Sequence, residues 1–176
     1  MKRFKVLIVI LLFFQFSFGQ ESENESFPES YFGIYKGELQ IYGGNATRTF
    51  PMEFHFLPSD STGVYKYMLV YGSGDVAEYR KYALIEKDKE QGVYLLDELN
   101  GIQLDCQVID NKMYFLFQVK DSLLTTFVTF EKDQLYFEII ATDTKKKNTS
   151  GGQDEETPEV FSYPIGVVQK AILIKQ

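Results

Sequence analysis

Hydrophobic and polar residues alternate along most of this chain, and the pattern is clearest in residues 101–143. Four short apolar runs, rich in β-branched and aromatic residues, follow one another there, separated by tight polar turns such as those at 110–112 and 131–134. Runs of this length and composition are typical of β-strands, and short polar turns join consecutive strands into hairpins. The segment therefore predicts an antiparallel β-meander.

The same period of two continues on both sides of this segment. In residues 32–42, Tyr35 and Leu39 alternate with charged and polar residues, as on a strand with one buried face. The further predicted strands are residues 49–57, 64–71, 76–86, 93–98 and 165–174. For residues 166–175 a helix is the alternative, since no proline or glycine interrupts the later part of that run.

These patterns predict an all-β protein with about ten strands. Connections are short except for one, and no long crossover separates the predicted hairpins. Sequential hairpins favour an antiparallel up-and-down meander barrel, in which no strand edge stays exposed. A β-sandwich is the alternative, because many short strands at regular spacing also fit that architecture.

The first 19 residues have the features of a signal peptide. Basic residues precede an unbroken apolar run at residues 6–14, and Ser17 and Gly19 place small residues where a signal peptidase reads. The run is short for a membrane span, although a retained anchor is the alternative. We expect cleavage before Gln20, a protein exported to the periplasm or the extracellular space, and no transmembrane span after cleavage.

The remaining chain is one domain's worth of sequence. Residues 20–30 are rich in Glu and Ser and predict a flexible lead-in, which Phe27 and Pro28 could attach to the body. Residues 31–176 are predicted to form a single barrel domain. Within it, residues 144–158 carry separated blocks of charge and predict a mobile loop.

Charge and residue content argue against several kinds of function. The formal net charge is −7 and becomes about −10 without the basic residues of the leader, so we expect no nucleic-acid partner. Cys106 is the single cysteine and lies on an apolar strand face, which predicts a buried, inert thiol. His55 is the single histidine and has no further ligands at metal-site spacing. We therefore predict a non-enzymatic protein without a catalytic site, metal or cofactor.

Aromatic residues are the most suggestive feature of the composition. The chain has 12 tyrosines and 16 phenylalanines, and many of the tyrosines fall in the first five predicted strands. Aromatic rings often serve simply as the core of a β-sheet. Alternatively, they line a ligand site in which rings supply area and hydroxyls supply orientation. The candidate ligand-binding residues are Tyr35, Tyr67, Tyr79, Arg80 and Tyr82, with Arg80 as a group able to bind a carboxylate.

The start of the barrel domain, residues 32–39, resembles the first strand of calycin-type barrels such as the lipocalins and, more distantly, the nitrobindin-like proteins. Those families begin strand one with Gly-x-Trp-x-Gly; here Gly33 and Gly37 flank Tyr35, at looser spacing and without tryptophan. The resemblance implies a cavity at one barrel mouth and a small apolar ligand. No histidine lies near the C-terminal end, so haem binding is not carried over.

Beyond that strand, the chain resembles small exported bacterial proteins of unknown function. Together these observations predict an exported, non-enzymatic β-barrel that binds a small apolar molecule in its interior. The alternative is a protein-interaction or envelope-associated module with a packed core and an envelope protein as partner. An enzyme is the third possibility, disfavoured because no set of acid, base and nucleophile is visible.

Overall fold

The computed structural model describes residues 26–44 and 46–176. The predicted leader at residues 1–19 and the first part of the predicted lead-in lie outside the described residues. Three helices occur within the described part, each a single 3₁₀ turn: η1 (Glu29–Tyr31), η2 (Gly74–Val76) and η3 (Thr144–Lys146). None of the described helices has the length and apolar character needed to cross a membrane.

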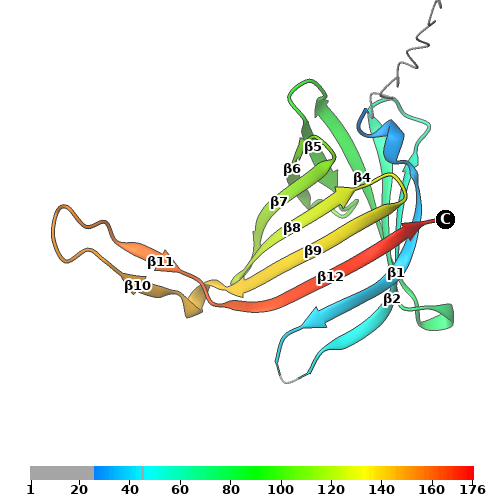
Figure 1. The fold of residues 1–176 in the computed structure, drawn as a ribbon. Helices are drawn as coiled ribbons and strands as arrows, with labels where there is room; N and C mark the ends of the chain where they lie inside the picture. The colour runs from blue at the N-terminus through cyan, green and yellow to red at the C-terminus, as the bar shows by residue number, and fades with distance from the viewer. Residues whose placement is uncertain (1–25, 45) are drawn as a thin grey trace, which may run out of the picture.

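Ten strands close into one antiparallel barrel, which confirms the predicted up-and-down architecture (Figure 1). Each strand pairs with its neighbours in the chain, and β12 pairs with β1 and β9 to seal the ring. The barrel strands are β1 (Gly33–Tyr42), β2 (Arg48–Pro58), β3 (Val64–Tyr71), β4 (Glu78–Asp88), β5 (Val93–Asp97), β6 (Gln103–Ile109), β7 (Lys112–Val119), β8 (Ser122–Phe130), β9 (Gln134–Asp143) and β12 (Ile165–Lys175).

The closing strand β12 is a strand along its whole length, so the helix alternative for residues 166–175 is wrong. Ala171 and Leu173 are buried, whereas Ile172 and Ile174 are about half exposed on the outer surface. This alternation is that of a strand, in which every second side chain points into the barrel interior. In a helix, four consecutive side chains point in different directions around the axis, so burial would not alternate from one residue to the next.

A second, two-stranded sheet projects from the barrel. The strands β10 (Asn148–Ser150) and β11 (Val160–Ser162) pair as a hairpin between β9 and β12 and extend away from the body (Figure 1). The residues predicted as a loop, 144–158, therefore contain η3, the first strand of this hairpin and most of its connecting turn. The ammonium of Lys147 lies 3.7 Å from the ring centroid of Phe161, a cation–π contact across the two arms.

Alternate side chains of the barrel strands point into the interior, and at one end aromatic rings pack together there. We call this layer the aromatic floor. Its members are Phe27, Tyr31, Phe32, Tyr35, Phe54, Phe56, Tyr65, Tyr94 and Phe130. The ring of Phe130 lies 5.1 Å from that of Tyr31 and 5.5 Å from that of Phe56, spacings at which aromatic pairs attract.

The segment before β1 forms part of this floor. Phe27 packs against Phe56 and Tyr94, at centroid distances of 5.7 and 5.3 Å. The 3₁₀ turn η1 is held by an ion pair of 3.0 Å between Glu29 and Lys89 on the β4–β5 turn. Residue Phe27, within the range predicted as a lead-in, thus attaches the chain to the body.

Candidate functional site

Above the aromatic floor the barrel interior is hollow. The cavity has a volume of about 1110 Å³, slightly larger than the roughly 300–1,000 Å³ of typical small-molecule sites. It reaches the β3–β4 and β7–β8 turns at the end opposite η1, where its lining includes the 86% exposed Val76. The cavity is therefore open to solvent at one end and closed by aromatic rings at the other.

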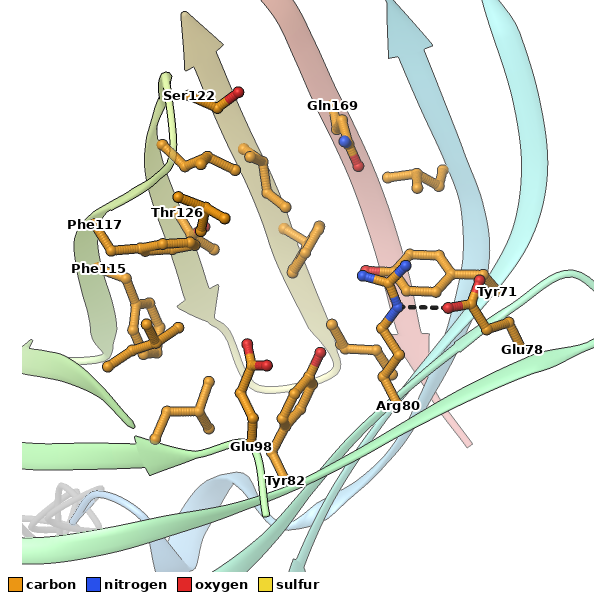
Figure 2. A pocket seen from close by; sticks show the side chains of 18 of the residues that line it. Tyr71, Glu78, Arg80, Tyr82, Glu98, Phe115, Phe117, Ser122, Thr126 and Gln169 are labelled. Carbon is orange, nitrogen blue, oxygen red and sulfur yellow. Dashed lines mark hydrogen bonds and ion pairs between the residues drawn. The ribbon is translucent and has the colours of Figure 1, made fainter. Parts of the chain in front are cut away.

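One wall of the cavity is apolar. It is formed by inward-facing residues of β7, β8 and β9, namely Phe115, Phe117, Leu124, Phe137 and Ile139 (Figure 2). Thr126 lies among them as the one buried polar residue of the described core. These strands place large hydrocarbon groups at every second position, so this wall offers a continuous surface to an apolar ligand.

The opposite wall, from β3 and β4, carries polar side chains beside Leu69. Arg80 donates from Nε to Oε1 of Glu78 at 2.8 Å, and its guanidinium carbon lies 5.3 Å from the ring centroid of Tyr71 (Figure 2). This hydrogen bond to the Glu78 carboxylate raises the pKa of Arg80 above its ordinary value. The guanidinium of Arg80 is therefore already paired with the Glu78 carboxylate and stacked on the Tyr71 ring.

Three tyrosines complete this side of the cavity. Burial raises the pKa of Tyr71 to about 12, and burial also raises the pKa values of Tyr67 and Tyr82. A phenol is neutral at physiological pH even at its ordinary pKa of about 10, and burial keeps these three phenols neutral to higher pH. Each can donate a hydrogen bond to a ligand while its ring contributes apolar area.

Glu98, which directly follows β5, is a lining residue that the sequence reasoning missed. Figure 2 shows its carboxylate beside Tyr82, and its negative charge contributes to the raised pKa of that tyrosine. A signal was present: Tyr94, Leu96 and Glu98 follow a period of two, so the inward face of β5 continues into Glu98.

The predicted ligand-binding residues separate into two groups. Tyr67, Arg80 and Tyr82 line the cavity and lie near one another on β3 and β4. Tyr35 is fully buried in the aromatic floor and does not line the cavity. Tyr79 is 60% exposed on the outer surface, because neighbouring residues on a strand face opposite ways. The candidate site therefore comprises the first three residues together with Tyr71 and Glu98.

The remaining reactive groups lie elsewhere. Cys106 is buried in the core, as predicted, and burial raises the pKa of its thiol to about 12, so little thiolate exists at neutral pH. His55 faces the outer surface and shares a 2.7 Å contact with Oε2 of Glu53. Within residues 26–44 and 46–176, no three metal-ligating side chains gather in one place.

Comparison with known proteins supports the fold. The sequence matches no family model, and no curated protein matches it. A solved structure of similar fold is a protein of unknown function from the DUF3598 family of Nostoc punctiforme, with a TM-score of 0.57 and 9% identity. The match covers 84% of this chain and 48% of that one, so this chain spans about half of that protein's length. At this identity the likeness is one of fold alone.

Proposed function

We propose that this protein is an exported, non-enzymatic barrel that binds a small apolar ligand in its interior. The observation that carries this proposal is the cavity of about 1110 Å³, bounded on one side by a wall of Phe, Leu and Ile side chains. Apolar surface left uncovered inside a protein is unfavourable, because each buried methylene contributes about 0.8 kcal/mol when it leaves water. A ligand with an apolar body would recover that free energy.

The chemistry of the described residues supports a binding role in preference to catalysis. The thiol of Cys106 lies in the packed core, and His55 is held on the outer face by Glu53. Neither group lines the cavity. The groups that do line it are tyrosine phenols, a matched Arg80–Glu78 pair and aromatic rings, which suit recognition and orientation of a ligand.

A pair of matched variants tests whether the cavity is the binding site. Leu124 on β8 lines the cavity, whereas Leu116 on the neighbouring strand β7 is 68% exposed on the outside. Replacing Leu124 by Trp should fill part of the cavity and weaken binding of the neutral fluorescent probe N-phenyl-1-naphthylamine by about tenfold or more. Leu116→Trp should leave the affinity within twofold. Absence of saturable binding to the unmodified protein, or equal effects of the two variants, would contradict the proposal.

Native mass spectrometry addresses the same proposal without a chosen probe. Protein purified from its producing cell under mild conditions should carry an additional small mass that is lost on denaturation. The Leu124→Trp variant should carry less of it than the Leu116→Trp variant. Sequencing the N-terminus of the protein from the exported fraction tests export separately, with Gln20 as the expected first residue.

An interaction role is the second candidate, and the projecting hairpin favours it. Val160, Phe161 and Tyr163 on or next to β11 are 39–50% exposed, an apolar patch outside the barrel. Replacing residues 147–163 by a short turn should abolish any chemical cross-link to an envelope protein if the hairpin binds a partner. Cross-links that persist in this variant would exclude the hairpin as the interface.

A further inference from the structure

Five charged residues line the cavity, and most of their charge is matched within the protein. They are Glu78, Arg80, Glu98, Lys120 and Asp121. Arg80 and Glu78 form the 2.8 Å pair described above. Asp121 pairs with the ammonium of Lys145 at 2.5 Å, and Lys120 is exposed to water on the β7–β8 turn.

Glu98 differs from the other four residues. It is half-buried, and its side chain has a single hydrogen-bond partner among the described residues, the amide nitrogen of Asn100 at 3.3 Å. A neutral amide at that distance is a weak partner for a carboxylate. Among the described residues of the lining, Glu98 is thus the carboxylate that forms no ion pair, and Lys120, which also forms none, lies exposed at the mouth.

We infer that the ligand of this cavity is an amphiphile with a cationic amino group, and that its ammonium binds Glu98. This inference rests on the proposed ligand-binding function and specifies the chemical class of the ligand. The ammonium would lie beside the carboxylate and the ring of Tyr82, which is adjacent to it (Figure 2). The hydrocarbon part would extend along the apolar wall of Phe117 and Leu124.

An ammonium suits this site better than a carboxylate does. A carboxylate deep in the cavity would depend on Arg80, because Lys120, the other lining cation, lies on the exposed β7–β8 turn at the mouth. Arg80 already donates to Glu78 and stacks on Tyr71, and Glu78 and Glu98 would repel a carboxylate. An ammonium gains a charged hydrogen-bond partner in Glu98 and an aromatic face next to it. The formal charge of −7 for the whole chain also attracts cations to the protein.

Three ligands with the same twelve-carbon chain test the inference: dodecylammonium, 1-dodecanol and dodecanoate, with the two ionic compounds below their micelle-forming concentrations and dodecanol below its solubility limit. The protein is purified from the cells that produce it, and affinity is measured by displacement of bound N-phenyl-1-naphthylamine. We expect dodecylammonium to bind about tenfold or more tightly than dodecanol, and dodecanoate to bind most weakly. Glu98→Gln should remove the preference for dodecylammonium and leave dodecanol unchanged.

Glu38→Gln is the matched control. Glu38 is exposed on the outer face of β1, and its replacement changes the net charge by the same amount as Glu98→Gln. It should retain the preference for dodecylammonium. Dodecanoate binding most tightly, or Glu98→Gln retaining the preference, would overturn the inference while leaving the proposed function intact. Failure of all three compounds to displace the probe would instead overturn the proposed function. The ranking of the three ligands on the unmodified protein tests the inference even if a variant fails to fold.

Discussion

The phenol hydroxyl of Tyr35 donates a hydrogen bond of 2.7 Å to the backbone carbonyl oxygen of Tyr31. Tyr35 belongs to β1 and Tyr31 to η1, so the bond connects the barrel wall to the turn that closes one end. Both side chains are buried in the aromatic floor. Tyr35 therefore has a structural role below the cavity, different from the ligand-binding role predicted for it.

Replacing Tyr35 by Phe should lower stability without changing ligand binding. The change removes the hydroxyl and leaves the Tyr31 carbonyl without this donor, which should cost about 1–2 kcal/mol of unfolding free energy. The midpoint of thermal unfolding should fall by about 2–8 °C. Tyr79→Phe is the control, because its hydroxyl is on the outer surface, and it should stay within about 0.5 kcal/mol of the original. If Tyr35→Phe bound the neutral probe more weakly, Tyr35 would have to be counted among the ligand-binding residues.

Alkaline pH should destabilise the barrel through its buried tyrosines. Burial raises the pKa of Tyr35 from 10.0 to about 12, and the same cause raises that of Tyr71 to about 12. A raised folded-state pKa contributes stability that is complete below the unfolded value and disappears as pH rises through the folded value. The contribution of these two tyrosines to the free energy of unfolding should therefore be constant below about pH 10 and fall between about pH 10 and 12.

Denaturant titrations across this range, followed by circular dichroism, provide the measurement. The Tyr35→Phe variant should show a shallower decline, since one buried phenol fewer has to ionise. A decline of equal slope in both proteins would show that Tyr35 does not contribute to the alkaline transition.

Replacing Gly37 by Ala should disturb the seam at which the barrel closes. A Cβ atom at this position of β1 would lie 2.3 Å from the backbone carbonyl oxygen of Ile172 on β12, so one backbone would have to move. We expect a loss of about 3 kcal/mol, at the upper end of overpacking effects. Gly166→Ala on the same β12 strand is the control, because its nearest neighbour would lie at 3.5 Å. Urea unfolding of both variants gives the comparison, and equal stabilities would show that the seam is looser than the structure indicates.

Replacing Glu78 by Gln should make the cavity more favourable to anions. The change removes the carboxylate that accepts the hydrogen bond from Arg80 and leaves the guanidinium with an unmatched positive charge. Affinity for dodecanoate should rise by about threefold to tenfold, and affinity for dodecanol should not change. Probe displacement measures both, with Glu38→Gln as the control for net charge. An unchanged affinity for dodecanoate would mean that a bound ligand does not reach Arg80.

Much of the fold could be predicted from the sequence, because a half-buried strand imposes a period of two on its side chains. The apolar run at residues 165–174 predicted β12 with a helix as the alternative, and the short turns gave the order of the strands. The hairpin of β10 and β11 was missed because three-residue strands such as Asn148–Ser150 are too short and too polar to show that period. An attachment through Phe27 could be expected from its apolar side chain, but its place in the aromatic floor could not, because the segment has no periodicity.

The candidate site was harder to predict, because it depends on distances along the barrel axis. Period-two patterns show that Tyr35 and Tyr67 both face inward, but not that one lies in the aromatic floor and the other in the cavity. The same pattern separates Arg80 from Tyr79, so strand geometry alone shows that Tyr79 cannot share a face with Arg80 and Tyr82. Glu98 follows Asp97 in the sequence, and the pattern does not show which of the two carboxylates faces inward; the structure places only Glu98 in the cavity lining.

The pairing of β1 with β12 has a consequence for biogenesis. Residues at opposite ends of the domain, such as Tyr35 and Lys175, are partners in one ladder, so the ring cannot be completed until the last strand has been synthesised. Until then β1 and β9 each present an unpaired edge, which invites association with other chains. A nascent polypeptide held unfolded until β12 has been synthesised would avoid that hazard, and messages truncated before residue 165 should yield insoluble protein.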